Sequence, residues 1–307
     1  MEKPGPGARA TTNWDGRGKI MLKEPVSDFE VQMHSELKDR VEIPSRYEFL
    51  KAHNGIRPNC LHGMIGTTGC GKSTLLKCII AETAQHKKVL VWLSEENVVE
   101  YQELINYLDK TCLKNILFIE EKEIPQEYKE TQQQFLEYFE QMVDESECDV
   151  VFIDNVTSSA FYNQRFGFLG QNRTAEYFMH FVKRKCSLFY VAHTSSNVTD
   201  NYNKIITPED IRGSKELPVV TEYFYTIQKF TTNDKIYNIL RVAKYRHHEN
   251  ARGYYALKFE KRSYIGDGKV PFELINKIFK GRDYLGRAAP KKAKDPKEAP
   301  QRQNSLL

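Results

Sequence analysis

The sequence has no hydrophobic run long enough to cross a bilayer, because none approaches the roughly 18 consecutive apolar residues that such a helix needs. It also begins without the apolar segment of a secretory signal. Its six cysteines form no CxxC pair and show no metal-ligand spacing, which indicates free thiols in a reducing compartment. We therefore expect a cytoplasmic protein, in the host cytoplasm if a phage encodes it, with no membrane partner.

The body of the chain has no excess of charge of either sign. The net charge is +4, and residues 282–303 alone hold seven Lys or Arg against three acidic residues. The rest of the chain balances at 38 basic and 38 acidic side chains. A nucleic-acid site in the body must therefore come from local clusters of basic residues.

Composition divides the chain into three regions. Residues 1–45 mix Gly, Pro and charged residues, and we expect an extended arm with one strand near 29–33. Residues 46–285 are sufficient for one α/β core with ATPase function. Residues 286–307 form a basic tail rich in Pro, Lys and Ala, for which we expect disorder.

The most informative motif lies at 66–73 and fits the phosphate-binding pattern GxxxxGKS/T at every constrained position. Gly69 and Gly71 let backbone N–H groups wrap a phosphate chain. Lys72 adds a positive charge, and Ser73 carries a hydroxyl that suits Mg²⁺. The sequence therefore predicts binding of ATP with Mg²⁺. The predicted nucleotide-binding residues are Gly66, Thr67, Thr68, Gly69, Cys70, Gly71, Lys72, Ser73 and Thr74.

Hydrophobic periodicity predicts strands alternating with helices, followed by a β meander. This order predicts an α/β fold with a mostly parallel twisted sheet, flanked by helices, and a C-terminal antiparallel β extension. The expected strands are 61–65, 89–93, 116–119, 150–153, 188–192, 222–230, 236–244 and 254–260, and the expected helices are 46–50, 71–84, 100–110, 127–143 and 174–185.

Carboxylates follow two of the predicted buried strands. Asp154 ends an apolar strand in the manner of a Walker B element, which predicts a Mg²⁺ site together with Ser73. Glu95 and Glu96 follow the strand 89–93, which we expect beside the strand of the phosphate loop. Glu96 is predicted to orient and deprotonate water. In the alternative interpretation both glutamates simply face solvent.

Four segments together resemble the RecA-like superfamily, and within it the ATPase core of DnaB-type replicative helicases and their relatives RadA and KaiC. Residues 55–61 resemble the GLxPGxL entry to the phosphate loop, and 94–96 resemble the SxE motif. Residues 210–214 resemble the DLRGS segment, and 242–246 resemble the AKxR strand end. The resemblance covers about residues 50–262 and implies a RecA-like P-loop NTPase core.

The resemblance implies further catalytic residues. It gives Arg246 the role of an arginine finger that reaches the γ-phosphate bound by a neighbouring subunit, with Lys244 in support. His193 stands where these helicases usually have Gln, so it is expected to sense the nucleotide, or else to be an ordinary strand-end histidine. Too few residues precede the phosphate loop for the helical N-terminal domain of DnaB proteins, so binding of a primase is not implied.

By this resemblance, the segments that follow Asp154 and His193 correspond to the loops that face the central channel in ring-shaped relatives. Aromatic residues interleaved with arginine suit base stacking and phosphate contact on single-stranded DNA. In the alternative, the aromatics, among them Phe161 and Tyr162, pack beneath the loop or against a neighbouring subunit. The predicted nucleic-acid contacts are Arg165, Phe166, Arg173, Lys204, Arg212 and Lys215.

These expectations combine into one function, an ATP-hydrolysing ring, hexameric by resemblance, that translocates on single-stranded DNA as a replicative helicase of phage or plasmid type. One alternative is a RadA-like recombinase or annealing ATPase. Another is a KaiC-like or packaging ATPase that is not a helicase. The last residues, 303–307 (Gln303 to Leu307), resemble the short peptide with which bacterial proteins bind the sliding clamp, or are simply the end of an unstructured tail.

Overall fold

The computed structural model describes residues 12–14, 20–22, 45–52, 55–162, 167–195, 205–232, 235–245 and 253–270. Near the N-terminus, β1 (Thr12–Trp14) and β2 (Ile20–Leu22) pair with each other in antiparallel fashion. The strand predicted at 29–33, the tail 286–307 and the clamp-like peptide 303–307 lie outside the described residues. None of the described helices is both long enough and apolar enough to span a membrane.

Among the described residues, nine strands form one sheet in the order β11-β10-β9-β8-β3-β7-β6-β4-β5. From β8 to β5 every neighbouring pair runs parallel, and from β8 to β11 every pair runs antiparallel. The predicted α/β fold is therefore confirmed. The strands are β3 (Leu61–Gly66), β4 (Val89–Leu93), β5 (Ile116–Glu120), β6 (Val150–Asp154), β7 (Ser187–His193), β8 (Tyr223–Thr232), β9 (Lys235–Tyr245), β10 (Gly253–Glu260) and β11 (Ser263–Lys269).

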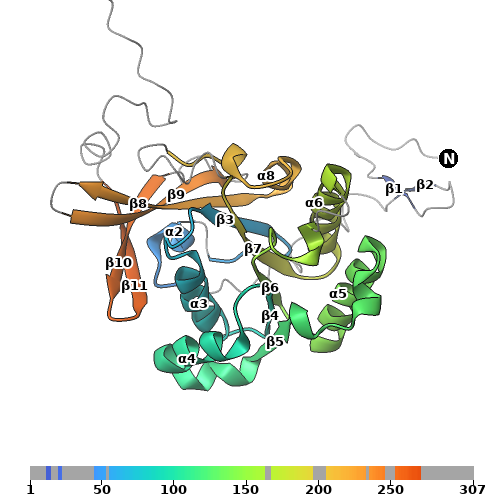
Figure 1. Cartoon of the computed structure of the whole chain (residues 1–307), viewed down its shortest axis with the longest axis horizontal. Helices are drawn as coiled ribbons and strands as arrows, with labels where there is room; N and C mark the ends of the chain where they lie inside the picture. The colour runs from blue at the N-terminus through green and yellow to red at the C-terminus, as the bar shows by residue number, and fades with distance from the viewer. Residues whose placement is uncertain are drawn as a thin grey trace, which may run out of the picture.

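Helices cover both faces of the sheet. The α-helices α3 and α4 lie on one side and α5 and α6 on the other (Figure 1). The α-helices are α2 (Glu48–Lys51), α3 (Lys72–Thr83), α4 (Val98–Asp109), α5 (Gln132–Ser146), α6 (Gly167–Arg184) and α8 (Glu216–Val220). Short 3-10 turns occur at η1 (Lys110–Asn115), η2 (Glu121–Glu123), η3 (Gln126–Lys129), η4 (Ala160–Tyr162) and η6 (Pro208–Asp210).

Strand β4 shows why the central strands are apolar without alternation. Val89 and Val91 belong to the core on the α3 and α4 side. Leu90 and Trp92 belong to the core on the α5 and α6 side. Because successive side chains of a strand point to opposite faces, a parallel strand covered on both faces must be apolar at every position.

Several predicted boundaries are wrong for local reasons. Helix α5 begins at 132 and not at 127, because Thr131 caps it through a capping box with Gln134. Helix α6 begins at Gly167 rather than at 174. Its first turn carries exposed apolar side chains, which interrupt the amphipathic pattern from which its start could be predicted. Strand β11 and helix α8 were not predicted.

The predicted surface loop after β6 contains core residues. Phe161 is 0% exposed and makes edge contacts with the rings of Phe135 and Phe139, at centroid distances of 4.8 and 5.0 Å. Tyr162 is also buried. Phe161 and Tyr162 therefore pack beneath the loop, as the alternative interpretation expected. Phe168, by contrast, is 72% exposed.

We predict that Phe161→Ala lowers the free energy of unfolding by about 3–5 kcal/mol, because it removes a buried ring from this aromatic cluster. The matched control is Phe168→Ala, an exposed phenylalanine on the same stretch of chain, which should change it by no more than about 0.5 kcal/mol. Urea denaturation followed by circular dichroism measures both values. Similar losses in the two variants would contradict this assignment of buried and exposed rings.

Candidate nucleotide-binding site

The candidate site forms at the edge of the sheet where the parallel strands end. Strand β3 leads into the phosphate loop, β6 ends at Asp154 and β7 ends at His193. Strand β4 pairs with β6 and β5 and not with β3, so the expected position of the glutamates next to the phosphate-loop strand is wrong. Since Leu93 is the partner of Asp154 in the sheet, Glu95 and Glu96 follow beside the Walker B strand instead.

The phosphate loop has the geometry that its sequence predicts. Gly69 and Gly71 adopt φ values of 73° and 94°, in the left-handed region that favours glycine. A Cβ atom built on Gly69 would meet no atom within 4 Å, so the loop is open at this point. Lys72 is the first residue of α3, and its Nζ donates to the carbonyls of Gly66 and Thr67, both at 2.9 Å. Two left-handed glycines, a helix N-terminus and a lysine therefore occur together, as in loops that bind phosphate.

The hairpin β10-β11 contacts the phosphate loop through Tyr264. The hydroxyl of Tyr264 donates to the carbonyl of Cys70 at 3.4 Å, and a Cβ atom on Gly71 would overlap this hydroxyl. Tyr47 in turn donates to the carbonyl of Tyr264 at 2.8 Å. Burial raises the pKa of the Cys70 thiol, so this cysteine fills space in the loop as an unreactive thiol.

The two side chains predicted to hold Mg²⁺ lie close to each other. Asp154 is only 4% exposed, and Tyr101 donates a hydrogen bond to its Oδ2. Burial raises the pKa of Asp154, while the Tyr101 hydroxyl and the nearby Ser73 hydroxyl oppose that rise.

These groups fit Mg²⁺ held in the usual way. Across the described residues, no group of three His, Cys, Asp or Glu side chains forms an all-protein metal cage. Mg²⁺ bound with a nucleotide needs only one or two protein oxygens, because phosphates and water complete its shell. Ser73 and Asp154 provide such a pair.

The two glutamates after β4 have different partners. Glu96 forms an ion pair with Lys77 on α3. Glu95 accepts hydrogen bonds from Ser158 and lies 3.1 Å from His193 Nε2. Partial burial raises the pKa of Glu95, but the hydrogen bonds from Ser158 and His193 outweigh it, so the pKa is lowered. Glu95, which was not predicted as a site residue, thus joins the network of His193.

His193 connects the site to the next loop. Its Nε2 lies 2.9 Å from the side-chain amide of Asn155, directly after the Walker B aspartate. Its backbone carbonyl accepts a hydrogen bond from the backbone N–H of Arg212 at 2.8 Å. The strand-end histidine is therefore bonded on one side to Glu95 and on the other to the segment that carries predicted nucleic-acid residues.

The two predicted nucleic-acid segments meet in space. Ser214 donates to the Asn172 side chain on α6, and a Cβ atom on Gly213 would meet Tyr162 at 2.9 Å. Their side chains Arg173, Arg212 and Lys215 are exposed. Arg165, Phe166, Lys204 and Arg246 lie outside the described residues.

Lys244 has a structural role within its own chain. Its Nζ donates to the carbonyls of Pro218 and Val219 at 2.8 and 2.6 Å, which belong to the C-terminal turn of α8. A hollow of about 580 Å³ beside it is also lined by Lys215 and Arg241.

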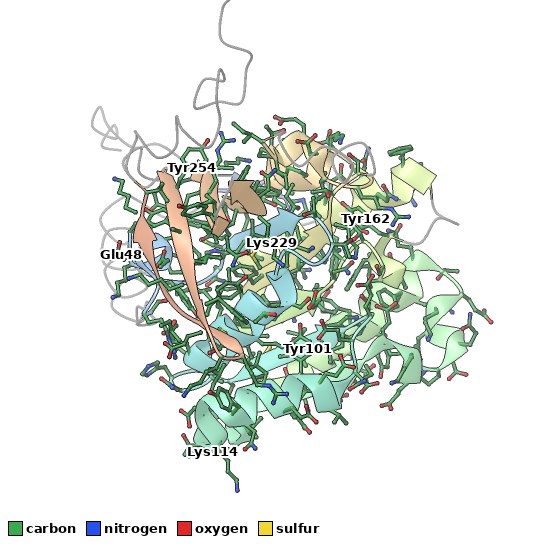
Figure 2. All side chains as sticks on the ribbon, turned by 60° about the vertical axis from the view of Figure 1, so that its left-hand side comes forward. Glu48, Tyr101, Lys114, Tyr162, Lys229 and Tyr254 are labelled. Carbon is green, nitrogen blue, oxygen red and sulfur yellow. The ribbon has the colours of Figure 1, made fainter. Side chains whose placement is uncertain are left out.

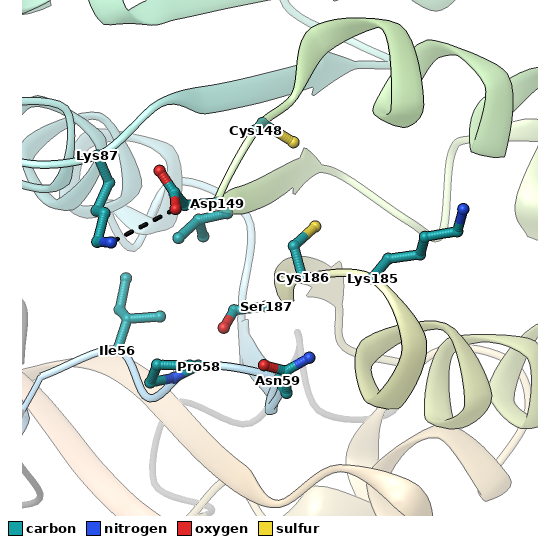
Figure 3. A pocket seen from close by; sticks show the side chains of 10 residues that line it. Ile56, Pro58, Asn59, Lys87, Cys148, Asp149, Lys185, Cys186 and Ser187 are labelled. Carbon is teal, nitrogen blue, oxygen red and sulfur yellow. Dashed lines mark hydrogen bonds and ion pairs between the residues drawn. The ribbon is translucent and has the colours of Figure 1, made fainter. Parts of the chain in front are cut away.

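A second hollow lies at the opposite edge of the sheet, where the strands begin. Its volume is about 180 Å³, and its lining includes Cys148, Cys186, Lys87 and Asp149 (Figure 3). Lys87 already pairs with Asp149 at 3.4 Å. This hollow is remote from the phosphate loop by topology and belongs to no predicted site.

Three residues that complete the site were missed in the sequence. Tyr101 on α4 and Tyr264 on β11 reach the site only through tertiary packing, and no local pattern identifies them. Lys77 gave a signal that was available, since it is a charged residue within the apolar run of α3 from Leu75 to Ala81.

Comparisons with known proteins agree with this site. Residues 51–176, which contain the phosphate loop and Asp154, match the family model described as ABC transporter, over less than half of the chain. No curated protein sequence gave a match.

Two solved structures share the fold. A KaiC-like protein from the archaeon Pyrococcus horikoshii OT3 aligns with a TM-score of 0.57 at 12% identity, covering 76% of this chain and 99% of that one. The flagellar accessory protein FlaH from Methanocaldococcus jannaschii aligns with a TM-score of 0.54 at 14% identity, with the same coverage of 76% and 99%. At these identities the likeness concerns the fold, which is RecA-like as expected.

The fold, the phosphate loop and the Walker B strand define the class of protein. The chain has a RecA-like fold with a C-terminal antiparallel extension, and its phosphate loop and Asp154 have the pattern of a P-loop nucleotide-binding protein.

We predict that Gly71→Ala lowers the free energy of unfolding by about 2–5 kcal/mol and weakens nucleotide binding. A left-handed φ costs a non-glycine residue about 1–2 kcal/mol. Overlap with the Tyr264 hydroxyl adds about 1–3 kcal/mol. Gly69→Ala is the control, because it has the cost of a left-handed φ but no overlap with a neighbouring atom. Urea denaturation measures both, and Tyr264→Phe in the Gly71→Ala background should recover part of the loss. Equal losses at Gly69 and Gly71 would refute the support from Tyr264.

Proposed function

We propose that the protein is an ATP-hydrolysing motor that acts on single-stranded DNA as a homo-oligomer, a hexameric ring in its simplest form, in the manner of a replicative helicase. The observation that carries this proposal is the connection from Glu95 through His193 to Arg212. It joins the end of the ATP site to an exposed basic segment by one side-chain contact and one backbone hydrogen bond. A change at the nucleotide can therefore alter the position of a surface that suits DNA.

Within the ATP site, each residue has a role that its position supports. Lys72 and the loop amides bind the phosphates, and Ser73 with Asp154 holds Mg²⁺. The bound Mg²⁺ would neutralise charge that develops on the phosphates. Glu96, whose charge is close enough to raise the pKa of Asp154, orients and deprotonates the attacking water.

The proposal assigns Arg246 to the site of the neighbouring subunit. It follows Tyr245, the last residue of β9, while Lys244 anchors that strand end to α8. A guanidinium supplied in trans stabilises the charge of the transferred phosphoryl group. ATP hydrolysis then depends on assembly of the oligomer.

We predict that Lys72→Ala abolishes ATP turnover and that Arg246→Ala binds ATP but hydrolyses it about 10³–10⁵-fold more slowly. Nucleotide affinity and steady-state phosphate release measure the two effects separately. The control is Arg262→Ala, an exposed arginine in the turn between β10 and β11, which should behave as wild type. Normal hydrolysis by Arg246→Ala would rule out the finger.

The proposed DNA surface combines cations with exposed apolar side chains. Arg173 and Arg212 are exposed near the junction of α6 with the segment before α8. Phe168 and Leu169, at the start of α6, are 72% and 66% exposed. Basic groups suit the phosphates of a single strand, and an exposed aromatic ring suits its bases.

We predict that Arg173→Ala combined with Arg212→Ala weakens single-stranded DNA binding and removes its stimulation of ATPase activity. If each arginine contacts one phosphate, the slope of log affinity against log salt falls by about 0.7 for each residue lost. Fluorescence anisotropy at several salt concentrations measures this slope. Lys110→Ala with Lys114→Ala removes two exposed cations from η1 and should leave the slope unchanged. An unchanged slope in the arginine pair would count against this surface.

A second candidate function is that of a KaiC-like or FlaH-like accessory ATPase without DNA. It is favoured by the likeness in fold to the archaeal KaiC-like protein and to the flagellar accessory protein FlaH. In that case single-stranded DNA would not change the rate of ATP hydrolysis.

One experiment separates these functions. ATP hydrolysis is measured with and without single-stranded DNA, and unwinding of a forked duplex is then followed on the same sample. Stimulation with unwinding supports the motor, and stimulation without unwinding supports a RadA-like recombinase. Absence of any stimulation refutes the proposal and favours the accessory ATPase.

A further inference from the structure

A chain of four side chains runs through the buried side of the candidate site. Tyr101 lies on α4 (Figure 2) and is fully buried. Its hydroxyl donates a hydrogen bond to Asp154 Oδ2. Lys77 Nζ lies over the Tyr101 ring, 4.5 Å from its centroid. Lys77 also forms an ion pair with Glu96. The Walker B carboxylate and the proposed water-activating glutamate are thus joined by Tyr101 and Lys77, independently of the phosphate loop.

The hydrogen bond between Tyr101 and Asp154 is buried. Tyr101 is 0% exposed and Asp154 4% exposed, so bulk water cannot easily replace either partner of this bond. A phenol has a single donor hydrogen, and here it is directed at Oδ2. That bond restricts rotation of the carboxylate about its last torsion and leaves lone pairs available toward Ser73.

The cation over the ring extends the effect to Glu96. An ammonium group held at a ring face is attracted by the ring quadrupole, and the attraction is stronger where water is excluded. Lys77 has a side chain only 11% exposed, and that of Glu96 is 28% exposed. The position of Glu96 is therefore tied to that of Tyr101 through one cation.

We propose that Tyr101 is a positioning residue that sets the orientation of the Asp154 carboxylate for Mg²⁺, and that Lys77 couples this orientation to the position of Glu96. The inference rests on the proposed ATPase function for its Mg²⁺ but not on DNA. It assigns to α4 a part in metal binding, although α4 contributes no ligand to the metal itself. Residues that orient metal ligands typically change metal affinity by about 10–100-fold when they are replaced.

The test is a Mg²⁺ titration of nucleotide binding, read by a fluorescent ATP analogue. In Tyr101→Phe the ring remains over Lys77 and only the hydroxyl is lost. We expect the half-saturating Mg²⁺ concentration to rise by about 10-fold or more, while binding in EDTA stays as in wild type. The matched control is Tyr107→Phe, which removes a hydroxyl from a 50% exposed tyrosine on the same helix and should not shift the titration.

Lys77 is tested with a pair of variants. Lys77→Met keeps an apolar stem but loses the charge, and we expect it to shift the Mg²⁺ titration in the same direction as Tyr101→Phe. Lys77→Arg keeps a cation and should retain the wild-type Mg²⁺ dependence. Because this pair reads the same quantity, it tests the coupling through Lys77 even if Tyr101→Phe fails to fold by circular dichroism.

Each outcome is decisive. A wild-type Mg²⁺ dependence in folded Tyr101→Phe overturns the positioning role, and an unshifted Lys77→Met overturns the coupling. Wild-type protein that binds the ATP analogue with Mg²⁺ but ignores DNA would refute only the proposed motor, and the titration would still decide the role of Tyr101. Wild-type protein with no Mg²⁺-dependent nucleotide binding would overturn both.

Discussion

The burial of the Asp154 carboxylate is the constraint on which the site depends. A carboxylate removed from water is costly unless donors satisfy it, and here the hydroxyl of Tyr101 on α4 donates to it. Helix α4 is thus fixed relative to β6 through one charged group. The apolar residues of α3 and α4 form a continuous core beneath this group, so packing and electrostatics require the same arrangement.

The sequence identified the parts of the site that depend on local geometry. The phosphate loop needs glycine where φ is positive, and a strand covered on both faces needs an unbroken apolar run before its terminal aspartate. Both requirements leave a readable pattern: Gly71 adopts a positive φ, Lys72 begins helix α3 and Asp154 ends strand β6. Their roles toward nucleotide and Mg²⁺ stay predictions.

The rest of the site depends on which strands become neighbours. The order that puts β6 and β7 between β3 and β4 is a property of the whole sheet, and it moves Glu95 and Glu96 away from the strand of the phosphate loop. For the same reason the pairing of Glu95 with His193 could not be predicted, since it joins residues on strands far apart in the chain. The exposure of Phe168 and the burial of Phe161 were equally hidden, because both are aromatic residues in the same stretch of sequence after β6.

The contact of Tyr264 with the phosphate loop has a consequence for biosynthesis. During translation the loop at 66–73 emerges long before residue 264, and the hydroxyl that donates to Cys70 and abuts Gly71 is then still missing. A ribosome-bound chain that has completed the parallel strands therefore has the nucleotide motif without the hairpin that braces it. Because closing such long-range contacts is the slow part of folding, the emerging protein acquires a fully braced loop only after its C-terminal hairpin has docked.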